Sequence, residues 1–182
     1  MKEAYHIKYL KNPEIDKLEW DDCIRKSANG LIYAESAYLD HMAANWDALV
    51  LNDYEAVMPL TWKRKWGIKY LYQPPFIQQG GIFFKKQLTA KTIQSFITEA
   101  SHKFKFAEFT INYLNEFPSG KGLQVKMRNN FILQLGDGYK HIAQRYNSYI
   151  KQRLSRLSKF SLQYKHVNDI TSAIKLYRNL YG

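Results

Sequence analysis

The residues best suited to chemistry lie at positions 62–84, where aromatic rings, cations, glutamines, a proline pair and a glycine pair occur together. This mixture is too apolar for a linker and too polar for a buried strand. Glutamine amides recognise peptide-like groups, and alternating cations and indoles can form an anion- or sugar-binding rim. We therefore expect this stretch to bind a small-molecule or peptide-like acceptor. The candidate substrate-binding residues are Trp62, Arg64, Tyr70, Tyr72, Gln73, Phe76, Gln78 and Gln79.

Each of these residues also has an ordinary structural interpretation. Most of the rings could pack in the core, and the Trp-Lys-Arg-Lys-Trp run at residues 62–66 could be a solvated hairpin tip. The glutamines could satisfy backbone groups instead of a ligand. Both interpretations stay open on the sequence alone.

Positive charge marks a second set of candidates. The net charge is +11, and most of the excess lies from Tyr139 onward, where Asp169 is the only acidic residue. Such a segment either binds a phosphate-bearing partner, such as RNA or a phosphorylated precursor, or forms a solvated helix face. The candidate phosphate-binding residues are Lys85, Lys86, Arg145, Arg153 and Arg156.

Metal and nucleophile chemistry find little support in the sequence. The single cysteine, Cys23, excludes an internal disulfide and an all-cysteine metal site, and we expect it to be a packed thiol. The five histidines never occur at metal-ligand spacing. The acids Asp47, Glu55 and Glu108 are isolated, so no general base is assigned and the catalytic residues stay unknown.

Composition predicts a packed globular protein. The chain has 182 residues, of which 46% are hydrophobic and 15% aromatic. No stretch reaches the roughly 18 apolar residues that a membrane span requires. The N-terminus lacks the apolar run of a secretory signal. We therefore expect a cytoplasmic protein without a transmembrane segment.

Hydrophobic patterning predicts an α+β fold in two parts, residues 1–137 and 138–182. The first part is expected to begin with a strand over 4–10, a helix from Asn12 to about residue 30 and a helix over 35–44. Three strands follow, over 46–51, 54–62 and 68–73. A helix over 89–104 then precedes strands over 106–112, 123–127 and 131–135. Pro59 is expected to interrupt or bulge its strand.

The second part is expected to extend the fold by helix, strand and helix. A long basic helix over 139–159 carries an apolar stripe, through which the chain could self-associate. A strand over 161–167 follows, and Asn168 and Asp169 are expected to cap a last helix.

This order of elements resembles the GNAT (Gcn5-related N-acyltransferase) fold, a mixed, mostly antiparallel sheet flanked by helices. Two stretches sharpen the likeness: WDALV leading to DYEAVMPL at 46–60, and YLYQPPF leading to QQGGIF at 70–83. They resemble the N-terminal half of Fem-like proteins, which are related to peptidoglycan aminoacyltransferases and are built from two GNAT-like halves. A basic helix joins the halves in that family, and residues 138–182 resemble this joint and the opening of a second half.

The resemblance implies transfer of an acyl or aminoacyl group to an amine, and it implies that this chain is inactive without a second half. Acyl-CoA is disfavoured as donor, because the loop before the helix at 89–104 has no glycine to let backbone amides approach a pyrophosphate. Fem-like enzymes use aminoacyl-tRNA, which leaves that donor open. The alternative is a noncatalytic module that binds a nucleic acid or cell-wall precursor through its basic helix.

Overall fold

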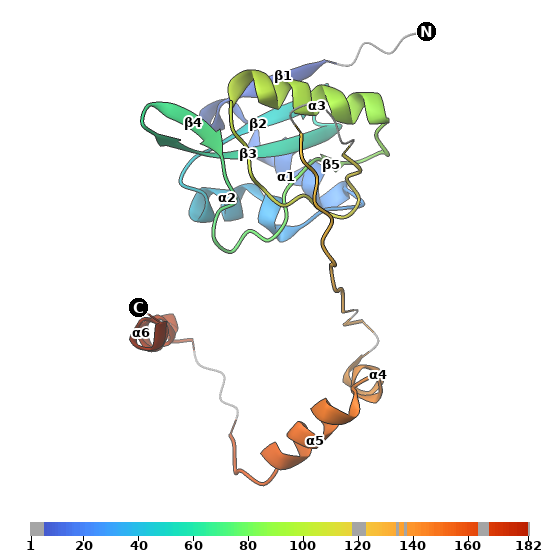
Figure 1. The fold of residues 1–182 in the computed structure, drawn as a ribbon, viewed down its shortest axis with the longest axis vertical. Helices are drawn as coiled ribbons and strands as arrows, with labels where there is room; N and C mark the ends of the chain where they lie inside the picture. The colour runs from blue at the N-terminus through green and yellow to red at the C-terminus, as the bar shows by residue number, and fades with distance from the viewer. Residues whose placement is uncertain (1–5, 118–122, 134, 137, 164–167, 182) are drawn as a thin grey trace. The chain divides into compact units, whose positions relative to one another are not determined.

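A computed structural model of the chain describes residues 6–117, 123–133, 135–136, 138–163 and 168–181 (Figure 1). The chain divides into two compact units, residues 1–130 and 131–182. The described residues form six α-helices and an open antiparallel sheet of five strands, which confirms the α+β class.

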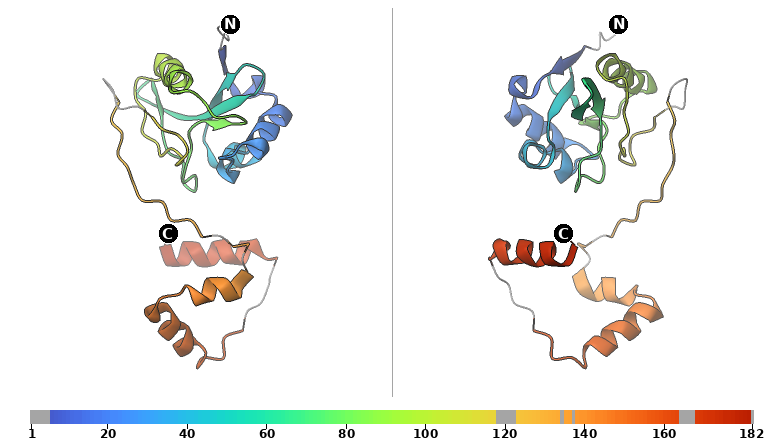
Figure 2. Two further views of the ribbon diagram at one scale, coloured as in Figure 1. Left: turned by 90° about the vertical axis from the view of Figure 1, so that its right-hand side faces the viewer. Right: turned by 60° about the vertical axis from the view of Figure 1, so that its left-hand side comes forward.

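The sheet organises the first unit. Its first four strands pair in chain order, each antiparallel to the next: β1 (Ile7–Leu10), β2 (Trp46–Leu51), β3 (Ala56–Lys65) and β4 (Ile68–Leu71). The short β5 (Phe83–Phe84) pairs with the start of β3. Every residue of β2 is buried. Both faces of the sheet are therefore covered, as Figure 2 also shows.

Helices α1 (Lys17–Lys26) and α2 (Ser36–Met42) cover one face, and α3 (Ala90–Lys103) covers the other (Figures 1 and 2). Trp20 of α1 is fully buried in the first core cluster, and Phe96 of α3 is fully buried in the second. Cys23 is buried on α1, and burial raises the pKa of its thiol, so the prediction of a packed thiol is confirmed.

The first helix starts later than predicted. Asn12–Glu14 form a separate 3-10 turn, and α1 begins only at Lys17. Asp16 caps it, because the carboxylate accepts hydrogen bonds from the backbone N–H groups of Leu18 and Glu19.

Pro59 lies inside β3 without interrupting it, so the predicted break is wrong. Pro59 pairs with Ala48 of β2. N–H groups along a strand point alternately to its two edges, and the N–H of Trp62 donates to the carbonyl oxygen of Asn45, on the β2 side, at 2.9 Å. The nitrogen of Pro59 therefore faces the opposite edge, where its missing N–H breaks no bond to β2.

The predicted strands after α3 do not form regular ladders. Residues 106–112 make two isolated parallel bridges, Ala107 with Leu71 and Ile111 with Gly80. The prediction of a hairpin over 123–135 is wrong, because the residues described in this range do not form a pair of strands. Residue 134 lies outside the described residues. The side chains of Phe131 and Leu135 are 91% and 71% exposed, and a strand pair without a surface to bury its apolar face is not stable.

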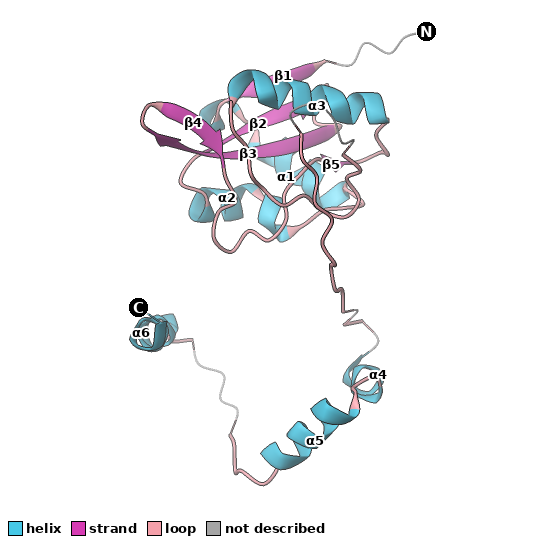
Figure 3. Ribbon diagram, viewed as in Figure 1, coloured by secondary structure: helices cyan, strands magenta, loops and turns pink. Residues whose placement is uncertain are grey.

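The second unit contains α4 (Gly138–Gln144), α5 (Ser148–Leu157) and α6 (Ile170–Tyr181). Figure 3 distinguishes these helices from the loops between them. The prediction of one helix over 139–159 is wrong, because Asn147 caps α5 by accepting a hydrogen bond from the N–H of Ile150 at 2.9 Å. The cap predicted for the last helix is confirmed, since Asp169 accepts from the N–H of Ser172 at 3.1 Å.

Of the strand predicted over 161–167, residues 161–163 have no strand conformation and residues 164–167 lie outside the described part of the chain. None of the helices in the described residues is long and apolar enough to cross a membrane.

Candidate functional site

The sheet has a gap along one edge of β3. On this edge β5 pairs with Ala56 and Val57, and β4 pairs only from Trp62 onward. Among the described residues, no strand pairs with β3 in between, and this is the edge that the nitrogen of Pro59 faces. Because the N–H and C=O groups of one residue share an edge, the carbonyl of Pro59 also faces the gap.

The chain leaves the sheet at the end of β4 and returns to it at β5, on the other side of this gap. Leu71 donates its N–H to the carbonyl of Phe106 at 2.9 Å, and Gly80 donates to the carbonyl of Thr110 at 2.8 Å. Residues 72–79 connect these two contacts on one side, and the much shorter stretch between Phe106 and Thr110 connects them on the other. The longer side, residues 72–79, therefore forms a loop, and this loop covers the gap.

Gln73 holds this loop in place. Its Oε1 accepts a hydrogen bond from the N–H of Thr110 at 2.8 Å, and its Nε2 donates to the carbonyl of Ile77. The side-chain amide thus takes the place of a backbone strand between the loop and residues 106–112.

A small cavity of about 20 Å³ lies beneath the loop. This volume suits a single water molecule. Its lining is mostly apolar and includes Leu39, Pro59 and Phe109, together with polar groups from Tyr33, Gln73 and Gln79. The Oε1 atom of Gln79 is buried and has no hydrogen-bond partner among the described residues, so it is an acceptor that a water molecule or a ligand donor could satisfy.

Three buried asparagines, which the sequence interpretation did not single out, support the far side of the gap. Asn29 donates to the carbonyl of Ile82 at 2.8 Å and accepts from the N–H of Phe84 at 3.3 Å. Asn115 accepts from the N–H of Ile82 at 2.6 Å and donates to the carbonyl of the same residue at 2.9 Å.

The third, Asn112, donates from Nδ2 to the carbonyl of Gly80 at 3.1 Å and accepts from Asn29 at 3.2 Å. The three side chains replace a missing neighbour strand for residues 80–84. The glycine pair was the signal that could have found them, because a Cβ on Gly81 would lie 2.2 Å from Oδ1 of Asn115.

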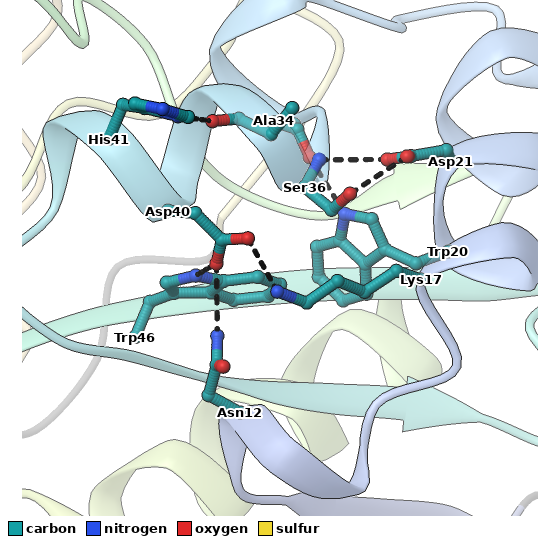
Figure 4. A network of polar contacts seen from close by, with 10 residues as sticks. Asn12, Lys17, Trp20, Asp21, Ala34, Ser36, Asp40, His41 and Trp46 are labelled. Carbon is teal, nitrogen blue, oxygen red and sulfur yellow. Dashed lines mark hydrogen bonds and ion pairs between the residues drawn. The ribbon is translucent and has the colours of Figure 1, made fainter.

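A network of polar contacts joins α1 to α2 and to Ala34, one of the residues that line the cavity (Figure 4). Asp21 accepts hydrogen bonds from the N–H and hydroxyl of Ser36, and Nε1 of Trp20 donates to the carbonyl of Ala34 at 2.7 Å. Asp40 accepts from Trp46 at 2.9 Å and pairs with Lys17. Burial opposes the ionisation of Asp40, but the bonds from Lys17, Trp46 and Asn12 outweigh it and lower its pKa.

The candidate substrate residues divide into two groups. Gln73 and Gln79 line the cavity, and Tyr72, Phe76 and Gln78 belong to the loop above it. Tyr72 is engaged in the fold, since its hydroxyl accepts from the N–H of Ala44 at 3.1 Å. Phe76 is 71% exposed.

The other group, Trp62, Arg64 and Tyr70, belongs to the hairpin of β3 and β4. Within the described part of the chain, the buried Nε1 of Trp62 has no hydrogen-bond partner, and Nζ of Lys69 lies 3.9 Å from the centre of the Trp62 ring. None of these three residues lines the cavity.

The phosphate candidates also lie in separate places. Lys85 forms an ion pair with Asp22 at 3.2 Å, whereas Lys86 is exposed in the loop before α3. Arg145, Arg153 and Arg156 belong to the second unit. Arg153 lies over the ring of Tyr149 at 4.7 Å.

Acid–base groups are scarce around the gap. Asp47 is buried, and its carboxylate accepts from the hydroxyl of Tyr9 at 2.5 Å and from the N–H of Asn12 at 3.2 Å, so its role is structural. No carboxylate or imidazole from the described residues lines the cavity. Nor do the described residues contain a group of His, Cys, Asp or Glu that could hold a metal ion.

Comparison with known proteins gives no match to a family model, to a curated protein or to a solved structure. Pro59 and Gln79 both line the cavity at the gap, and the buried Oε1 of Gln79 has no hydrogen-bond partner among the described residues.

Proposed function

We propose that this chain is an N-acyltransferase of the GNAT class, similar to the N-terminal half of Fem-like proteins, which transfers an acyl or aminoacyl group to an amine. The observation that carries the proposal is the gap in the sheet beside Pro59, closed by the loop at 72–79 and lined by Gln79. An amine has N–H donors, and Oε1 of Gln79 and the carbonyl of Pro59 are acceptors that suit them.

The arrangement around α3 supports this class. The chain passes from β4 through α3 to residues 106–112, which contact Leu71 in parallel orientation. Parallel segments of a sheet are usually connected by such a crossover helix. Positioning the amine and the acyl carbon within reach of each other supplies much of the rate of such a transfer.

The reaction requires little from the side chains. The amine nitrogen bonds to the acyl carbon, and the bond from that carbon to the donor oxygen breaks. The amine loses a proton to water, and the departing oxygen takes up a proton from water, so that the donor leaves as a free hydroxyl. Aminoacyl-tRNA is the donor that we favour, because no glycine precedes α3 in residues 84–89 to cradle the pyrophosphate of acyl-CoA. A cavity of about 20 Å³ is too small for the acceptor, so the loop must move on binding.

Gln79→Leu is expected to lower kcat/KM for the amine acceptor about tenfold to a hundredfold, since it removes a buried acceptor at similar volume. The measurement is transfer from aminoacyl-tRNA and, separately, from acyl-CoA, with this chain and with its longest natural form. Gln94→Leu, at an exposed position of α3 outside the cavity lining, is the matched control. No transfer from either donor by the longest form would refute the proposed function.

A second candidate is a noncatalytic module that binds RNA or a phosphorylated cell-wall precursor through α5. Its supporting observation is that Lys151, Arg153 and Arg156 are all exposed and that no acidic residue lies in residues 138–163. The apolar side of α5 is also partly exposed, at Ile150, Leu154 and Leu157, which suits self-association.

Neutralising Arg145, Arg153 and Arg156 together to Gln is expected to weaken RNA binding and to make its salt dependence less steep by about three units of slope. Fluorescence anisotropy with a labelled RNA at several salt concentrations measures this. Binding that does not respond to salt would rule out the second candidate.

A further inference from the structure

The hairpin of β3 and β4 carries an exposed tryptophan at its tip. Lys65 pairs with Ile68, so the turn consists of Trp66 and Gly67 alone. Both have positive φ, 49° and 78°, which defines a type I′ turn. The side chain of Trp66 is 88% exposed and that of Ile68 is 45% exposed. In Figure 3 the hairpin extends past α2 and α3.

Cations lie on both faces of this hairpin. Directly opposed residues share a face, so the pair of Arg64 and Lys69 lies on one face. Lys63 and Lys65 alternate with Arg64 along β3 and lie on the other face. No acidic residue occurs in residues 62–71. The tip is therefore apolar and is surrounded by positive charge.

We propose that this hairpin docks on an anionic lipid surface. Trp66 and Ile68 enter the boundary between headgroups and acyl chains, where an amphipathic indole is favoured. The cations of both faces then lie at the depth of the lipid phosphates and contribute electrostatic attraction.

The geometry favours a lipid surface over a nucleic acid strand. A nucleic acid strand that lies along one face of the hairpin contacts the cations of that face only. A lipid surface that the tip enters contacts the cations of both faces. Two of the rings that could stack against bases, those of Trp62 and Tyr72, are already covered, since Lys69 lies 3.9 Å from the centre of the Trp62 ring and Lys63 lies 4.4 Å from that of Tyr72.

The decisive variant is Trp66→Asn. Asparagine followed by glycine is the preferred sequence of a type I′ turn, so this change removes the indole and preserves the hairpin. The matched control is Phe76→Asn, which also replaces an exposed aromatic residue at positive φ, 65°, outside the hairpin. Vesicle flotation of the whole chain is measured with phosphatidylcholine alone and with equal parts of phosphatidylcholine and phosphatidylglycerol.

We expect binding to the anionic vesicles only, and a loss of about tenfold or more in Trp66→Asn but not in Phe76→Asn. Arg64→Gln and Lys65→Gln, one on each face, should each weaken binding about fivefold, and Lys91→Gln on α3 should weaken it less. The basic second unit can also attract anionic lipid, so Arg145, Arg153 and Arg156 are neutralised in a parallel set of variants.

Three results would overturn the proposal: no binding to anionic vesicles, unchanged binding in Trp66→Asn, or binding that depends on the second unit alone. Tighter binding to single-stranded RNA that depends on only one of Arg64 and Lys65 would also overturn it and would assign the hairpin to nucleic acid.

Discussion

Gly81→Ala is expected to lower the free energy of unfolding of the first unit by about 3 kcal/mol. Gly81 has a φ of 106°, a conformation that residues with a Cβ rarely adopt, and the new Cβ would lie 2.2 Å from Oδ1 of Asn115. Either the backbone around Gly81 or the Asn115 side chain must shift, and both residues are buried. Urea unfolding followed by tryptophan fluorescence measures the effect, because all four tryptophans lie in the first unit.

The adjacent glycine supplies the control. A Cβ on Gly80 would approach only the carbonyl of Thr110, at 3.7 Å, which is an ordinary contact. Gly80→Ala should therefore change the free energy of unfolding by less than about 1 kcal/mol. Combining Gly81→Ala with Asn115→Ala should cost less than the sum of the single changes, because the contact is then removed. Additive costs would show that this contact is not the cause.

Asn29→Asp should destabilise the first unit by about 3–5 kcal/mol at neutral pH. Asn29 is 3% exposed, and its Nδ2 faces two acceptors, the carbonyl of Ile82 and Oδ1 of Asn112. An aspartate there cannot donate to them unless it is protonated. Burial and these acceptors would hold the pKa of the new carboxyl above its unfolded value.

The sign of this pH dependence is specific. A raised folded pKa favours the native state at low pH and loses that contribution as the pH rises, so the difference between Asn29→Asp and the unaltered protein should shrink on acidification. Urea unfolding at neutral pH and near pH 4 measures it. Asn129→Asp makes the same chemical change at an exposed site and should be nearly neutral. A difference that stays constant with pH would contradict the assigned environment of Asn29.

The local sequence pattern was enough to predict those elements whose apolar residues and caps lie within the element itself or directly beside it. The expected strand over 46–51 coincides with β2, and the expected helix at 89–104 corresponds to α3, which Thr89 caps through the N–H of Thr92. In these elements periodicity and capping act over a few residues, so the sequence carries the signal.

Distant contacts explain what was missed. The bonds of Asn29 to Ile82 and to Asn112 span 53 and 83 residues, and no local pattern indicates them. Residues 106–112 were predicted as a strand from their composition, yet only isolated bridges form. Gln73 and Gln79 were predicted as candidates from amide chemistry. Their hydrogen bonding depends on tertiary structure: Gln73 is bonded to Thr110, whereas Oε1 of Gln79 has no partner among the described residues.

The asparagine cluster also has a consequence for the order of folding during synthesis. The backbone N–H of Ile82 donates to Oδ1 of Asn115, although Asn115 is made well after β5. Until that residue leaves the ribosome, the N–H of Ile82, next to β5, lacks its native partner. Closing long loops before their contacts form slows folding and prolongs exposure of incomplete edges. The first unit therefore completes its core only when nearly all of it has been translated.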